Sequence, residues 1–145
     1  MAEMVQASHV LTVATRGKGF TEITEAIAEW LDSLSAEAGL LTVFVRHTSA
    51  SLTIQENADR NMRRDLLDAL ERLAPESAAY AHREEGPDDM PSHIKAMLTS
   101  VSLGIPVMAG RMALGTWQGV YLIEHRAQPH RRSVVLSFVG HAAAA

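Results

Sequence analysis

The sequence predicts a single α+β domain, and three observations support this fold class. The length of 145 residues is that of one domain, and the composition, 47% hydrophobic and 21% charged, is ordinary for a globular protein. Segments with apolar residues at helical spacing alternate with β-branched segments typical of strands. No internal repeat or low-complexity linker divides residues 1–145, and only the alanines at 142–145 are expected to fray.

The N-terminal part predicts strands around a first helix. Residues 8–15 are rich in β-branched side chains and predict a strand, and the glycines after them predict a turn. Apolar residues at helical spacing predict a helix that has Thr21 as its cap and ends near Gly39. Residues 40–46 and 51–55 then predict a hairpin-like pair of strands.

A second amphipathic helix is expected from Asn57, as its cap, to Pro75, where proline ends it. Its predicted buried stripe consists of Met62, Leu66, Ala69, Leu70 and Leu73. Residues 75–92 contain three prolines and a run of charges, which predicts a long polar loop. Long ordered loops often carry function.

A short third helix is expected to open at Pro91 or Ser92 and to end at Gly104. The rest of the chain is rich in β-branched residues separated by turn signals. Strands are therefore predicted at 105–107, 120–124 and 133–139.

Composition excludes several classes of function. The chain has no cysteine, which rules out disulfides, thiolate zinc sites and a cysteine nucleophile. A net charge of -4 offers no overall attraction to nucleic acid. The start of the chain lacks the pattern of a secretory signal, and no apolar run is long enough to span a membrane. We therefore expect a cytoplasmic protein without nucleic-acid or membrane partners.

Histidines and carboxylates are the strongest chemical signal. His82 and His93 flank an acidic loop at 84–89, and imidazole with carboxylate is a ligand set of divalent first-row metals. A solvated acidic loop is the alternative, and the spacing matches no helical ligand motif. His47 follows an apolar strand, where its side chain would either project into a cleft or bond to nearby hydroxyl groups.

Further polar residues lie at the ends of predicted strands and at turns. Glu56 ends a strand and faces His47 or solvent. Glu124 and His125 are adjacent on one strand, so they should face opposite sides and at most one should enter a given site. Three arginines flank a turn, where they either bind phosphate or keep a hairpin tip soluble: Arg126, Arg131 and Arg132. Thr116 and Gln118 lie between two glycines, as expected where backbone approaches a ligand or a core tryptophan packs at a bulge.

Three segments together resemble the YjbQ family, also described as the secondary thiamine-phosphate synthase family. They are HTSASLTIQENAD at 47–59, YAHREEGPDDMPSHIKAML at 80–98 and IPVMAGRMALGTWQGVYLIEHR at 105–126. The resemblance extends over nearly the whole chain. It implies a compact α+β fold with a layered, mainly antiparallel sheet, assembled as a homotrimer with the polar motifs near subunit boundaries. It also implies a weak transferase activity that joins hydroxymethylpyrimidine pyrophosphate to thiazole phosphate.

The residues that match the family's polar motifs are His47, Ser51, Glu56, His82, Asp88, His93, Thr116, Gln118 and Glu124. From this resemblance we hypothesise that the three histidines bind a divalent metal ion, zinc-like or magnesium, which neutralises a small phosphorylated substrate. Asp88 would orient a histidine, and Glu56 or Glu124 would move a proton. Substrate contacts would come from Ser51, Thr116, Gln118 and the three arginines.

The ligand set does not match the reaction easily, because three histidines suit zinc, nickel or iron, whereas pyrophosphate release usually employs magnesium. Two other functions therefore stay open. One is a metal-dependent hydrolase of a small phosphorylated or carboxylated molecule, and the other is a non-catalytic module that binds a small anion.

Overall fold

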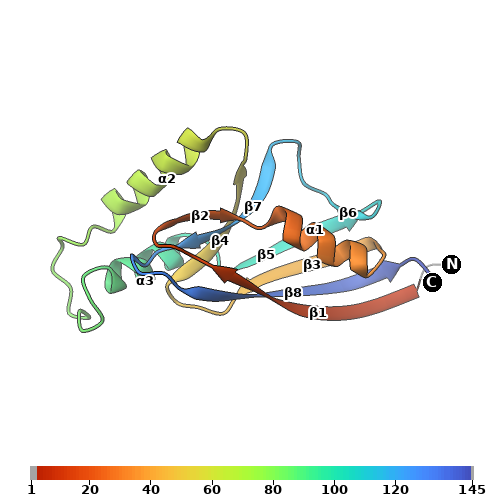
Figure 1. The fold of residues 1–145 in the computed structure, drawn as a ribbon, viewed down its shortest axis with the longest axis horizontal. Helices are drawn as coiled ribbons and strands as arrows, with labels where there is room; N and C mark the ends of the chain where they lie inside the picture. The colour runs from red at the N-terminus through yellow and green to blue at the C-terminus, as the bar shows by residue number, and fades with distance from the viewer. Residues whose placement is uncertain (1–2, 145) are drawn as a thin grey trace.

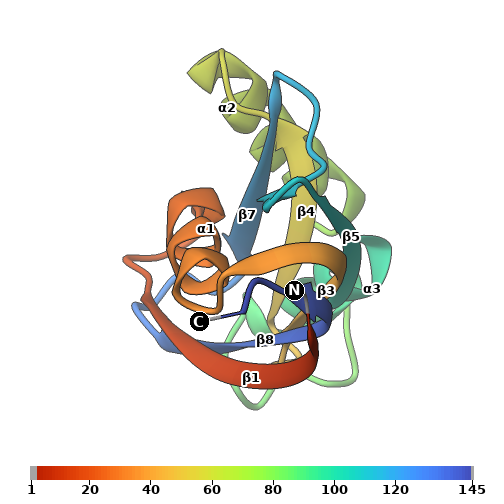
Figure 2. The ribbon, with the colours of Figure 1, turned by 90° about the vertical axis from the view of Figure 1, so that its right-hand side faces the viewer.

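The structure is a computed structural model that describes residues 3–144, and its main layer is a curled five-stranded sheet (Figures 1 and 2). This sheet, called sheet A, has the strand order β1-β8-β3-β5-β6, with antiparallel neighbours throughout. Its strands are β1 (Glu3–Ala14), β3 (Ala36–Val45), β5 (Ser102–Met108), β6 (Arg111–Met112) and β8 (Arg131–Ala142). The predicted α+β fold with a layered, mainly antiparallel sheet is confirmed.

A second, three-stranded sheet and helix α1 (Thr24–Ser33) enclose the core with sheet A. Sheet B has the order β2-β7-β4, formed by β2 (Gly19–Glu22), β7 (Gln118–Glu124) and β4 (Ala50–Glu56). Alternation along β7 sends Val120 and Leu122 into the same apolar cluster as Ile27 and Leu31 of α1. On β8, the inward side chains Leu136 and Phe138 are fully buried.

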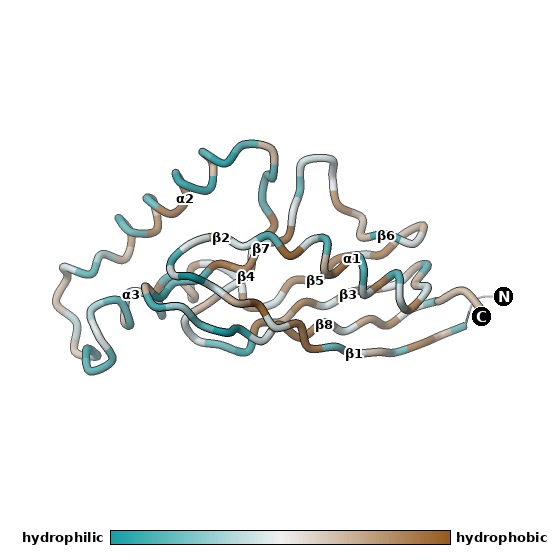
Figure 3. Tube along the Cα trace, in the orientation of Figure 1, coloured by the Kyte–Doolittle hydropathy of each residue, from teal (hydrophilic) through white to brown (hydrophobic). Residues whose placement is uncertain are grey.

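The other two helices lie outside this core. Helix α2 (Arg60–Leu73) projects beside sheet B, and hydrophilic and hydrophobic residues alternate along it (Figures 1 and 3). The expected apolar stripe is present but not buried: no residue of α2 is buried, and Leu73 is 66% exposed. Helix α3 (Asp89–Leu98) packs against the end of sheet B through a buried face that includes Ser92 and Lys95.

Several predicted boundaries are wrong because tertiary pairing overrides local pattern. Thr21 does not cap a helix, since it lies in β2 and pairs with Leu122 of β7. The strands around residues 46–49 do not form a hairpin, because β3 belongs to sheet A and β4 to sheet B. The cap of α2 is Asp59, whose carboxylate accepts from the N–H of Asn61. The chain between β3 and β4 therefore crosses from sheet A to sheet B.

The C-terminal end is more ordered than predicted. Ala142 is buried as the last residue of β8, and the N–H of Ala143 donates to the carbonyl oxygen of Ser35. Residue 145 lies outside the described residues. Within residues 3–144, none of the three helices has the length and apolar character needed to cross a bilayer.

Candidate metal centre

Helix α3 presents two polar side chains one turn apart on one face. Asp89 is its first residue, and His93 follows at position i+4, the spacing that places side chains side by side on a helix. Asp89 is buried, whereas the side chain of His93 is 30% exposed. A carboxylate and an imidazole therefore meet at the start of α3, with one side open to solvent.

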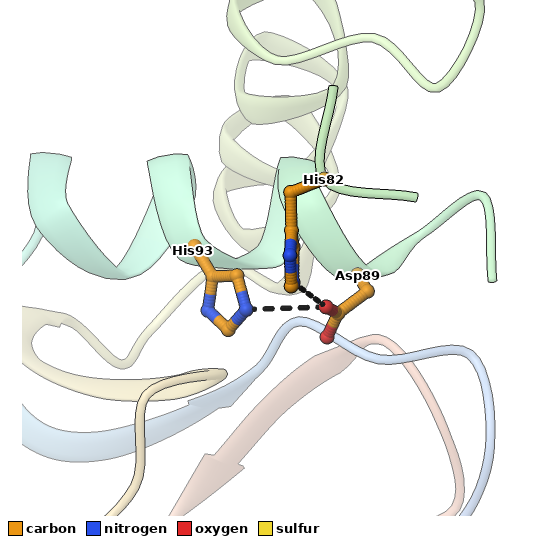
Figure 4. Close-up of side chains that lie close together, drawn as sticks. All are labelled: His82, Asp89 and His93. Atoms are coloured by element: carbon orange, nitrogen blue, oxygen red, sulfur yellow. Dashed lines mark hydrogen bonds and ion pairs between the residues drawn. The ribbon is translucent and has the colours of Figure 1, made fainter. Parts of the chain in front are cut away.

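The third member of the cluster comes from the loop before α3. His82 places its Nε2 at 2.7 Å from Asp89 Oδ2, and His93 Nε2 lies 3.2 Å from the same oxygen. Figure 4 shows the three side chains pointing toward one another, two from α3 and one from the loop. The three candidate ligand atoms lie within 4.8 Å of one another.

Hydrogen bonding selects the ligand atom of His93. Its Nδ1 lies 2.9 Å from the carbonyl oxygen of Thr48, which can only accept a hydrogen bond. Nδ1 must therefore carry a proton, and a neutral ring has its lone pair on Nε2, which faces Asp89 and His82. A backbone carbonyl that fixes the tautomer in this way is a common partner of metal-ligating histidines.

Arg126 fixes the carboxylate of Asp89. Its Nη1 donates to Asp89 Oδ1 at 2.8 Å, its Nε donates to Asp88 Oδ2 at 3.0 Å, and its Nη2 donates to the carbonyl oxygen of Glu85 at 2.9 Å. Because Oδ1 of Asp89 is engaged, Oδ2 is the oxygen that faces the histidines. We define these contacts, from Arg126 to Asp88, Asp89 and Glu85, as the Arg126 clamp.

The cluster fits a small divalent ion with nitrogen and oxygen ligands. Zinc bonds of about 2.0–2.2 Å place neighbouring ligand atoms of a tetrahedral site about 3.4 Å apart. The separation of 3.2 Å between Asp89 and His93 is close to this value. His82 at 2.7 Å is closer, so it must withdraw slightly, and its side chain is 53% exposed on a loop.

His47, the third predicted metal ligand, is not brought into this cluster. Its Nε2 accepts a hydrogen bond from the N–H of Ser133 at 2.8 Å, so the proton of the neutral ring is on Nδ1. Neither nitrogen then offers a free lone pair. Burial and the nearby charge of Arg132 lower the pKa of His47, which keeps the ring neutral.

Asp88 does not orient a histidine, contrary to the prediction. Its Oδ2 accepts from Arg126 and from the N–H of Ala127 at 2.8 Å. Burial alone would favour the neutral acid, but these hydrogen bonds outweigh it and lower the pKa of Asp88. Asp88 therefore serves the Arg126 clamp, and the residue that meets the histidines is its neighbour Asp89.

Two predicted site residues form a separate buried ion pair. Arg132 donates to Glu124 through Nε at 2.8 Å and also through Nη2, and Thr15 Oγ1 donates to Glu124 at 2.7 Å. Burial raises the pKa of Glu124, but these donors outweigh it and the pKa is lowered overall. Glu124 is thus an ionised structural partner rather than a group poised to move a proton.

Three more predicted residues lie at the opposite end of sheet B. Ala50 pairs with Glu124 near the histidines, whereas Glu56 pairs with Gln118 at the far end of β4. The seven residues of β4 place these two ends about 20 Å apart. Gln118 closes a turn there by accepting from the N–H of Gly115, and Thr116 is exposed in that turn. Arg131 is exposed at the start of β8.

Sequence reasoning missed a buried polar layer beneath α3. Ser51 Oγ, predicted to contact substrate, is fully buried and lies 2.8 Å from His125 Nε2, and Thr99 Oγ1 donates to it at 2.6 Å. Lys95 is buried beside this group and forms an ion pair with Glu71 of α2. These contacts anchor α3. Asp89 could have been found from its spacing with His93, had the helix been started at residue 89.

Comparison with known proteins adds the family. A family model described as UPF0047 protein YjbQ-like matches residues 9–141. The chain belongs to the YjbQ (UPF0047) family. The UPF0047 protein sll1880 of Synechocystis is 47% identical over 93% of this chain and 92% of its own, and the UPF0047 protein YjbQ of Salmonella typhimurium is 44% identical over 90% and 95%.

Solved structures of the family have the same fold. An uncharacterized YjbQ/UPF0047 protein from Clostridium acetobutylicum superposes with a TM-score of 0.81 at 34% identity, covering 91% of this chain and 98% of its own. A protein of unknown function from Sulfolobus solfataricus, 20% identical, reaches a TM-score of 0.88 over 95% of this chain and 99% of its own.

The expected thiamine-phosphate synthase activity was wrong. The relatives are named only as UPF0047 proteins, and the solved structures are described as uncharacterized or of unknown function, so membership of the family supplies no activity. Of the expected phosphate contacts, Arg126 and Arg132 are each paired with a carboxylate in the structure.

Burial of His125 should make stability depend on pH. Burial, with the charge of Lys95, lowers the pKa of His125 from 6.5 to about 4, so between these values the unfolded state binds more protons than the folded state. The free energy of unfolding should therefore be highest above pH 6.5. It should fall as the pH is lowered toward 4, by up to about 1.4 kcal/mol per pH unit. Urea unfolding at a series of pH values measures this slope.

The matched variants are His125→Gln and His141→Gln, the latter at an exposed position of β8. His125→Gln should flatten the slope between pH 4.5 and 6.5, and His141→Gln should leave it unchanged. A wild-type slope that persists in His125→Gln would show that another group causes it.

Proposed function

We propose that this protein is a metal-dependent enzyme whose metal centre is formed by His82, Asp89 and His93. The observation that carries the proposal is the convergence of two imidazole Nε2 atoms on one carboxylate oxygen. Two imidazoles and one carboxylate suit zinc, iron or nickel better than magnesium, which prefers oxygen ligands. A zinc-like ion therefore matches these ligands better than magnesium. The proposed third ligand is now Asp89, in place of His47, which the sequence had suggested.

The reaction class that suits this site is hydrolysis. Three protein ligands with a position open to water are the arrangement of catalytic rather than structural zinc sites, and a bound ion supplies an acidified water molecule. The chain's own residues hold the ion's ligands: Thr48 sets the tautomer of His93, and Arg126 sets the orientation of Asp89. Solvent reaches the site at the exposed sides of His82 and His93. The substrate is proposed to be a small molecule.

Metal titration tests the centre. Protein stripped with a chelator should bind one zinc ion per chain, measured by calorimetry and by elemental analysis. Asp89→Asn and His93→Gln should each weaken binding by more than about 100-fold, beyond the loss typical of outer-shell changes, because each removes a ligand. Asp68→Asn, an exposed carboxylate on α2, is the control and should bind like the wild type.

Turnover tests the reaction class with the same variants. A panel of small phosphate and carboxylic esters should be hydrolysed only by metal-loaded protein and not by Asp89→Asn. Failure to bind zinc stoichiometrically would refute the centre. Stoichiometric binding without turnover of any ester would refute hydrolysis alone.

We also propose that the chain assembles as a homotrimer through the outer face of sheet A. On this face, Phe44 pairs with Val135, and Leu40 pairs with Val139. Phe44, Leu40 and Val139 are each more than two-fifths exposed. A row of exposed apolar side chains across the middle of a sheet marks an interaction surface. A second copy of the chain is the occupant expected from the family resemblance.

Light scattering coupled to size-exclusion chromatography measures the assembly. The wild type should have three times the 15.8 kDa mass of the chain. Phe44→Glu should reduce the mass to that of one chain, because a buried unpaired charge destabilises the interface. Leu73→Glu, at the exposed end of α2, makes the same kind of change outside sheet A and should leave the mass unchanged. A monomeric wild type would contradict the proposal.

A further inference from the structure

A second polar group lies beside the crossing from β3 to β4, apart from the proposed metal ligands. Arg132 is buried, and the N–H donors of two of its three nitrogens all have acceptors. Nε and Nη2 donate to Glu124, and Nη2 also donates to the Oγ of Ser49 at 3.0 Å. Its third nitrogen, Nη1, lies 3.4 Å from Nδ1 of His47. The question is whether that contact can be a hydrogen bond.

The tautomer of His47 excludes it. Because Nε2 accepts from the N–H of Ser133, Nδ1 carries the ring proton and is itself a donor. An arginine nitrogen is also only a donor, so Arg132 Nη1 and His47 Nδ1 present hydrogens to the same space, and residues 3–144 place no acceptor between them. Both hydrogens point toward the same space, so one oxygen that accepts from the two nitrogens would satisfy both.

The space beside these donors is a groove at the edge of the proposed trimer face, since Phe44 also lines it. Both donor side chains line this groove of about 480 Å³, which we call the His47 groove. Arg46, an exposed residue, also lines it and adds positive charge. Since Glu124 already balances Arg132 and His47 is neutral, the remaining charge at this groove is positive. The complementary ligand is therefore an anion that can accept hydrogen bonds.

We propose that the His47 groove binds an oxyanion, the phosphate or carboxylate group of a small molecule, whose oxygen accepts from Arg132 Nη1 and His47 Nδ1. Hydrogen bonds from charged donors to anionic oxygens are about twice as strong as those between neutral groups. This site shares none of the three proposed metal ligands, and its one link to them is Thr48, which lines the groove and whose carbonyl oxygen accepts from His93. It gives His47 and Arg132 a role in binding an anion that does not involve a metal.

Nitrogen NMR of the wild-type protein tests the donor arrangement directly. In anion-free buffer, the histidine ¹⁵N shifts of His47 should show a protonated Nδ1 and an unprotonated Nε2. Titration with inorganic phosphate should move the Nδ1 resonance in a saturable way, and a parallel titration with acetate shows whether a carboxylate is also accepted. An unprotonated Nδ1, or no saturable shift with either anion, overturns the proposal and leaves the groove to water.

Variants separate this site from general attraction by charge. His47→Phe should weaken phosphate binding at least tenfold, the effect of losing a hydrogen bond to a charged group. Arg46→Ala, at an exposed position that should not disturb folding, should weaken it several-fold. Arg64→Ala, an exposed arginine on α2, is the charge-matched control and should bind like the wild type.

His82→Ala removes a proposed metal ligand that does not line the groove. This variant should bind phosphate like the wild type, so failure of the metal centre and failure of this site can be told apart. Equal weakening by Arg46→Ala and Arg64→Ala would show nonspecific attraction and would overturn the proposal.

Discussion

The Arg126 clamp is the interaction on which the candidate site depends. One guanidinium joins the turn after β7 to the loop before α3, because it donates to Asp88, to Asp89 and to the carbonyl oxygen of Glu85. A planar fork of donors holds carboxylates in a fixed orientation, which a lysine could not do. This contact orients the carboxylate of Asp89 and ties the loop before α3 to the core through Glu85.

The rest of the fold supplies a rigid base for the clamp. Arg126 follows β7, the central strand of sheet B, and α3 is anchored beneath by Lys95 and by the hydrogen bond from Thr99 to Ser51. The exposed side of the cluster is the loop at 74–88, which can adjust around an ion. Sites held by buried elements on one side and a loop on the other combine fixed ligands with access for solvent.

The sequence predicted the strands well, because alternation and β-branched content report directly on half-buried sheets. It failed where distant pairing decides: Thr21 lies at a helical spacing but pairs with β7, and residues 46–49 resemble a turn but cross between sheets. Of the three histidines that were predicted to converge, the structure brings His82 and His93 together. Asp89 was missed because the third helix was predicted to begin at Pro91 or Ser92, whereas α3 begins at Asp89. His47 was misassigned because no sequence pattern reveals that its Nε2 accepts a hydrogen bond from the N–H of Ser133.

The most direct measurement of the central claim is the zinc affinity of Arg126→Gln, determined by competition with a chelating dye. The clamp predicts an affinity about 10–100-fold below that of the wild type, the usual effect of losing a group that orients a ligand, with an unchanged circular dichroism spectrum. Arg131→Gln, which alters an exposed arginine at the start of β8, should retain the wild-type affinity. An unchanged affinity in Arg126→Gln would contradict the claim that this arginine sets the metal-binding oxygen of Asp89.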